Sequence, residues 1–185
     1  MKLSISTPLF VTILLLLSTR ATAMCPQEKG NTAHTCNIAY NTIAHIVQQQ
    51  APDESMASSL PIVNEWICSC IMITPISNNN NNAADFMTLK SNAHHLVGTL
   101  MTHLNALDKA IFISETCQLV AAICSEDPAQ FPLGQITDQA SGQAHLANFA
   151  QTLTPKITTL KQIQSQIALS TEKLNQWLSL NAKKS

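Results

Sequence analysis

The residues of this chain best suited to chemistry are its six cysteines, Cys25, Cys36, Cys68, Cys70, Cys117 and Cys124. An even number of cysteines is typical of a disulfide framework when a chain is exported to an oxidising compartment. The CxC spacing of the middle pair differs from the CxxC of redox and zinc sites. We therefore expect up to three disulfides, and no thiol-based catalytic or metal site.

Helical geometry restricts how these cysteines pair. Cys117 and Cys124 are seven residues apart, so on one continuous helix their Cα atoms would be separated by about 10 Å, beyond the roughly 7 Å limit for a disulfide. Cys68 and Cys70 would point to opposite sides of a helix and would need separate partners. The first two cysteines flank a short polar segment that a bridge would close. The sequence predicts a Cys25–Cys36 bridge, with Cys68 and Cys70 each bonded to Cys117 or Cys124.

Histidines and acidic residues form no recognisable site. His94, His95 and His103 share one predicted helix, but a helical metal site needs histidines three or four residues apart. The acidic pairs Asp53-Glu54 and Glu126-Asp127 each adjoin a proline, where capping or loop solvation explains them. Metalloprotease, serine-hydrolase, phosphate-binding and calcium-binding motifs are missing from the sequence. We predict no catalytic residue, no cofactor and no bound metal.

The first 23 residues are typical of a cleaved signal peptide. Lys2 precedes an apolar stretch from Leu9 to Leu17, and Ala21-Thr22-Ala23 supplies small residues before the cut. The apolar stretch is much shorter than the roughly 20 residues that a membrane span needs. We expect residues 1–23 to be removed and the mature chain, residues 24–185, to be secreted or periplasmic, with no stable membrane span.

The composition predicts one packed domain with a weakly charged surface. The chain is 45% apolar and 11% charged, which argues against wholesale disorder. Without Lys2 and Arg20, the mature chain has eight lysines, eleven acidic residues and no arginine, a net charge of −3 with histidine neutral. Scattered lysines without arginine do not suit nucleic acid. We expect no nucleic-acid partner.

Hydrophobic periodicity predicts helices along most of the mature chain. Residues 37–50 place on one helical face the side chains Ile38, Thr42, Ile43, Ile46 and Val47. Residues 62–73 fit either a helix or a strand, and we favour a helix because no second strand candidate exists to pair with it. Residues 84–124 predict one helix about 60 Å long, and the pattern leaves open whether it is continuous or bends near 112–114.

The C-terminal part predicts two further helices. After a loop at 125–136, one helix covers 137–152, and Thr154-Pro155 caps and begins a last helix that ends near Leu180. Its apolar residues repeat in a heptad-like stripe: Leu153, Ile157, Leu160, Ile167, Leu174 and Leu178. An Asn-rich linker occupies 77–82. The predicted fold is all-α, a single disulfide-stapled antiparallel helical bundle of four to five helices.

The function predicted by elimination is noncatalytic binding of another macromolecule, as an inhibitor, adhesin, accessory protein or effector. The partner would be an extracellular or periplasmic protein. A weakly charged face of the last helix would cost little to desolvate and carries Thr158, Thr159, Gln162, Gln164, Ser165, Gln166 and Ser170; an ordinary low-charge secreted surface explains it as well. Two alternatives stay open: a carrier of a lipid or other apolar ligand inside the bundle, and an enzyme whose site is not visible as a motif.

Overall fold

The computed structural model describes residues 31–72, 83–126 and 139–182 of the 185-residue chain. Every element in these ranges is helical, in the order α2 (Ala33–Gln49), η1 (Glu54–Ser58), α3 (Leu60–Trp66), η2 (Ile67–Ile71), α4 (Ala83–Glu126) and α5 (Gln139–Leu180). The short element η1 is a 3-10 turn and η2 is a π-helical turn. The predicted all-α class is confirmed for the described residues, including residues 62–71 of the segment for which the sequence favours a helix over a strand.

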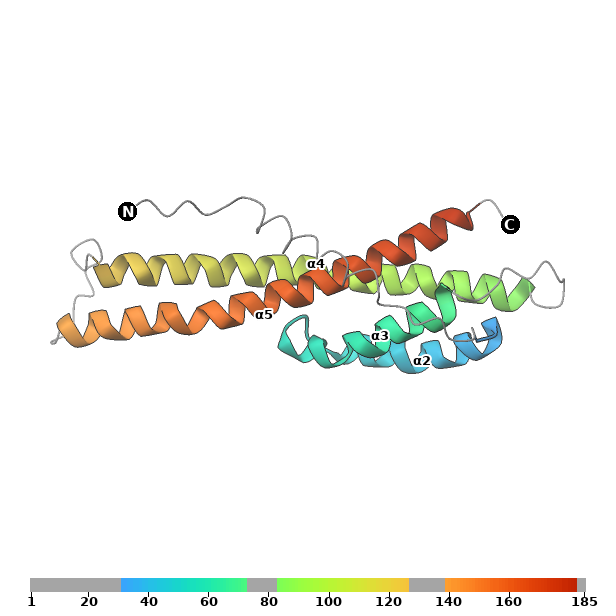
Figure 1. The fold of residues 1–185 in the computed structure, drawn as a ribbon, viewed down its shortest axis with the longest axis horizontal. Helices are drawn as coiled ribbons and strands as arrows, with labels where there is room; N and C mark the ends of the chain where they lie inside the picture. The colour runs from blue at the N-terminus through green and yellow to red at the C-terminus, as the bar shows by residue number, and fades with distance from the viewer. Residues whose placement is uncertain (1–30, 73–82, 127–138, 183–185) are drawn as a thin grey trace, which may run out of the picture.

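The two long helices, α4 and α5, lie side by side and antiparallel (Figure 1). Near the start of α4, the Lys90 ammonium donates to the Asn181 carbonyl at 3.1 Å. Further along, the Lys161 ammonium lies 2.6 Å from the Glu115 carboxylate. Residue numbers therefore rise along one helix as they fall along the other, which is the register of an antiparallel pair.

The N-terminal helices α2 and α3 pack against one half of this pair (Figure 1). The Asn37 amide donates to the Asp85 carbonyl at 2.9 Å, and the His103 imidazole lies 3.1 Å from the Val47 carbonyl. These two contacts place α2 along residues 85–103 of α4. The other half of the pair, nearer the α4–α5 connection, has no third helix beside it among the described residues (Figure 1).

The hydrophobic core lies where α2, α3, α4 and α5 meet. The predicted stripe of α5 is confirmed at its buried members, Ile157, Leu160, Ile167, Leu174 and Leu178. On α4 the buried apolar residues are Leu89, Ala93, Leu96, Leu100, Leu107 and Ile111. Trp66 joins α3 to α2, because its indole N–H donates to the Cys36 carbonyl at 3.1 Å and its ring lies 5.5 Å from that of Tyr40.

The predicted face of α2 is correct at Ile43 and Val47, which are buried, and wrong at Ile38 and Thr42, which are exposed. The buried residues are Cys36, Tyr40, Ile43 and Val47, spaced four, three and four apart, whereas Ile38 is 60% exposed. The helix begins at Ala33, four residues earlier than predicted, with the Thr32 hydroxyl accepting from the Thr35 N–H. This earlier start brings Cys36 into the helix, where it is the first residue of the buried face.

The helix predicted over 84–124 is a single continuous element, α4, with no break at 112–114. The change in its apolar pattern near residue 112 has another cause. Phe112 and Ile113 lie beyond the part of α4 that α2 contacts, and they are 69% and 60% exposed. The pattern therefore changes because the number of neighbouring helices changes.

The sequence predicts two C-terminal helices with a boundary at Thr154-Pro155. In the structure they are one helix, α5, with Pro155 inside it. Proline at this position has no N–H to donate to the carbonyl of Gln151, one turn earlier. Neighbouring groups form other bonds: the Gln118 amide of α4 donates to the Ala150 carbonyl at 3.2 Å and to the Thr154 hydroxyl at 2.7 Å. Thr154 is thus bonded to α4 and does not begin a new helix.

The predicted disulfide pairing is wrong. Cys36 is bonded to Cys70, which lies 34 positions further along the sequence, and their Cα atoms are 5.5 Å apart, so Cys36 is not bonded to Cys25. Proximity in sequence favoured the Cys25–Cys36 bridge, but the packing of α2 against α3 and η2 brings Cys36 next to a cysteine far along the chain. The bridge ties α2 to the π-helical turn.

The remaining cysteines are accounted for as far as the structure describes them. Cys68 is also disulfide-bonded, whereas Cys117 is an exposed free thiol and Cys124 a buried one. The predicted bonds from Cys68 and Cys70 to this last pair are therefore wrong. Several predicted features lie outside the described residues: Cys25, the signal peptide predicted at 1–23, the linker predicted at 77–82, and all but the first two residues of the loop predicted at 125–136.

Candidate functional site

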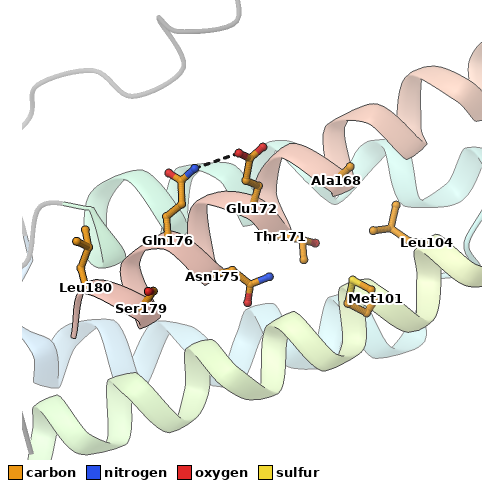
Figure 2. Close-up of a pocket in the computed structure, with 9 residues that line it drawn as sticks. All are labelled: Met101, Leu104, Ala168, Thr171, Glu172, Asn175, Gln176, Ser179 and Leu180. Carbon is orange, nitrogen blue, oxygen red and sulfur yellow. Dashed lines mark hydrogen bonds between the residues drawn. The ribbon is translucent and has the colours of Figure 1, made fainter. Parts of the chain in front are cut away.

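An open groove of about 790 Å³ runs between α4 and α5 in the half of the pair that α2 and α3 also contact (Figure 2). Residues of both long helices line it: Met101, Leu104, Ala168, Thr171, Glu172, Asn175, Gln176, Ser179 and Leu180. Its size falls in the range of ligand-binding sites in proteins.

Helical periodicity explains why these residues share one face of α5. Six of them follow Ala168 at intervals of three, four, seven, eight, eleven and twelve residues, which brings them to one side of a helix. Ser170, whose hydroxyl donates to the Asn64 side chain of α3 at 2.6 Å, lies on a different side of α5. At 100° per residue, Asn175 points roughly 140° away from Ser170. The groove therefore opens away from α3.

The lining combines apolar and uncharged polar groups with one carboxylate. Met101 is 44% exposed and Leu180 is 77% exposed, so both present apolar surface to solvent. The Gln176 amide donates to the Glu172 carboxylate at 3.0 Å, the dashed line in Figure 2. The Thr171 hydroxyl is engaged with its own helix. The amide of Asn175 adds donor and acceptor groups at the groove wall, an arrangement suited to contact with a partner's backbone or polar side chains.

The histidines are dispersed, as their spacing predicts, and none lines this groove. His103 is buried against the Val47 carbonyl, and His95 Nδ1 lies 2.7 Å from the Tyr40 hydroxyl. His34 lies 3.8 Å from the Asp85 carboxylate on an exposed surface. These three side chains serve packing or surface contacts. Within the described ranges, no three His, Cys, Asp or Glu side chains gather as metal ligands would.

The weakly charged face predicted as a contact surface is only partly free. The Gln164 amide contacts the Asp108 carboxylate across the α4–α5 interface, and Ser170 is buried against Asn64. Hydroxyls of Thr158 and Thr159 bond to carbonyls of their own helix. The α5 wall of the groove begins at Ala168, near the end of this face, and continues to Leu180, so it lies about three turns further along α5. None of the seven residues of the predicted face lines it.

A smaller groove of about 370 Å³ lies between α2 and α3, beside the Cys36–Cys70 bridge. Its walls include the exposed residues Thr42 and Ile62 and the buried ring of Trp66. It is half the size of the α4–α5 groove, and its polar wall residues lie near a structural disulfide. The larger groove is therefore the stronger candidate.

In the three described ranges, no helix is both long enough and apolar enough to cross a membrane. Comparison of the chain with protein-family models, with curated proteins and with solved structures gives no match.

Proposed function

We propose that this chain is an exported helical protein that acts without catalysis, by binding an extracellular or periplasmic protein in the groove between α4 and α5. The finer architecture belongs to the same proposal: one antiparallel bundle stapled by disulfides, released from a signal peptide at residues 1–23. The observation that carries the binding function is the groove itself, whose wall has apolar anchors, amides and hydroxyls but one charged side chain.

The shape of the groove favours a segment of a macromolecule over a small molecule. From Ala168 to Leu180 the wall follows α5 for about 18 Å. A helix that lays its apolar face into such a groove presents anchors every three or four residues over two to three turns. Exposed methionine suits this role because its unbranched side chain adapts to different surfaces.

The chemistry of the wall favours a partner with few charges. Desolvating amides and hydroxyls costs less than desolvating ions, provided that the partner supplies hydrogen bonds. Glu172 already shares its carboxylate with the Gln176 amide, so part of its hydrogen-bonding capacity is satisfied before a partner arrives. A partner segment with apolar anchors and polar edges fits these groups best.

The test is capture of a partner from the native extracellular fraction by the wild-type protein and by two matched variants. Met101→Lys places a charge in the groove, whereas Met87→Lys makes the same change at a methionine of α4 outside the groove, with nearly the same exposure, 49% against 44%. One stoichiometric protein should be retained by the wild type and by Met87→Lys, and lost with Met101→Lys. Equal retention by both variants, or no retained protein, contradicts the proposal.

The same samples separate the two other classes of function. A carrier of apolar molecules would copurify with lipid, visible by native mass spectrometry, and its melting temperature would rise with the lipid added. An enzyme would turn over a substrate in an activity assay of the wild-type protein. Either result in place of protein capture would replace the proposal.

A further inference from the structure

The outward face of α4 carries an exposed apolar stripe beyond the part that α2 covers. Large side chains on this face have high exposure: Phe112 69%, Ile113 60%, Leu119 61%, Val120 40% and Ile123 41%. With about 200 Å² for a large side chain, the exposed part is on the order of 500 Å². A patch of that size is comparable to the largest apolar patch on a typical monomeric protein, and such patches are often functional.

The spacing of the stripe is that of a coiled-coil seam. The exposed residues Lys109, Phe112, Thr116, Leu119, Ile123 and Glu126 follow one another at intervals of three, four, three, four and three. This interval keeps one row of side chains facing a partner helix. Ile113 and Val120 lie beside the row and widen it. We call this row of six residues the outer seam.

The outer seam is complementary to itself when reversed. In a two-fold symmetric antiparallel pair centred between Cys117 and Gln118, each seam residue meets the one equally far from the centre. Phe112 then packs against Ile123 of the other copy. Lys109, at one end of the seam, meets Glu126 at the other end, so opposite charges close both ends.

We infer that the outer seam of α4 docks against the outer seam of a second copy of this chain, antiparallel, to form a homodimer. A two-fold interface uses the same patch on both subunits, and the order of charged, apolar and charged residues in this patch satisfies that requirement. In a parallel pair, Lys109 would face Lys109 and Glu126 would face Glu126. The charges therefore select the antiparallel arrangement.

The interface differs from the groove proposed above, so the inference does not depend on that function. Its apolar area is below the roughly 800 Å² per partner of a standard interface, and the dimer should dissociate on dilution through the micromolar range. The Lys161–Glu115 ion pair and the contacts of Gln118 with α5 stay inside each subunit. Each copy therefore keeps its own helix pair when it docks.

The test uses charge reversal followed by sedimentation velocity over a range of protein concentrations. Lys109→Glu alone and Glu126→Lys alone should each weaken self-association roughly 10- to 30-fold, because two attractive contacts become repulsive. An equimolar mixture of these two variants should form a heterodimer, since both of its end contacts are again attractive. The double variant Lys109→Glu/Glu126→Lys should recover the wild-type affinity.

Two controls separate docking from folding. Both seam charges are exposed, so circular dichroism and the melting temperature of dilute samples should stay unchanged. Glu54→Lys, an exposed reversal in η1 away from the seam, should leave association unaffected, and Leu119→Lys should abolish it. Wild-type protein that stays monomeric at several hundred micromolar overturns the inference, as does a variant mixture no more associated than either component. Capture of a partner by the monomer in the groove experiment would still support the proposed function.

Discussion

Removal of the Cys36–Cys70 disulfide should lower the free energy of unfolding by about 4 kcal/mol. The bridge spans 34 residues, and the entropy of closing an unfolded loop of that length corresponds to this figure at 25 °C. Both cysteines are buried, at 0% and 1% exposure, so the variant Cys36→Ala/Cys70→Ala also loses packing of two sulfurs. Because Cys68 is disulfide-bonded as well and keeps the unfolded chain partly constrained, the loop-entropy value is an upper one.

The assay is guanidinium unfolding followed by far-UV circular dichroism at neutral pH. The matched control is Cys124→Ala, which removes a buried free thiol at 4% exposure without breaking a bridge and should cost about 1 kcal/mol. The double variant should also unfold with a steeper dependence on denaturant, because its unfolded state exposes more surface. A double variant as stable as Cys124→Ala would refute the view that this bridge holds α2 against η2.

Three further predictions concern single residues. Burial raises the pKa of Tyr40, so the stability that neutral Tyr40 contributes is complete below the unfolded pKa of about 10 and is lost as the pH rises through the folded pKa. Tyr40 is the one tyrosine of the chain, so its ionisation can be followed by absorbance near 295 nm. An ordinary tyrosine pKa in the folded protein would contradict the prediction. A hydrogen bond from the Ser55 backbone N–H lowers the pKa of Asp53, so the melting temperature of the wild type should fall as the pH drops below about 4. Asp53→Asn should make that fall smaller. The same dependence of melting temperature on pH in both proteins would contradict a stabilising role for this hydrogen bond. Pro155→Ala restores an N–H that can bond to the Gln151 carbonyl and should stabilise the protein by about 2 kcal/mol in urea unfolding, whereas a loss of stability would show that proline is needed in α5.

Elements with long regular apolar repeats could be predicted from the sequence. The buried stripes of α4 and α5 have the intervals that the sequence shows, and α3 follows from the lack of a strand to pair with it. Pro155 misled the prediction because local propensity ends a helix there, whereas the contacts of Gln118 with the α5 backbone come from a residue 36 positions away from Thr154.

The disulfide partner and the candidate groove could not be predicted in this way. Both depend on how the helices are rotated against one another. Periodicity shows which residues share one face of a helix, but it does not show which other helix packs on that face. Cys36 looked close to Cys25 in sequence, but its neighbour in space is η2. Asn175 and Gln176 directly follow Leu174, a residue of the apolar stripe of α5. That they line a groove becomes visible only in the structure, where Met101 of α4 lies opposite them (Figure 2).

The position of the Cys36–Cys70 bridge has a consequence for biogenesis. A chain that is synthesised from its N-terminus presents both of these thiols before any residue of α4 or α5 has emerged. Cys36 and Cys70 can then become oxidised before Cys117 and Cys124 have emerged. At that stage these two later thiols cannot form wrong disulfides with them. A free peptide that ends at Ile71 should therefore already form this bond when an oxidant is present.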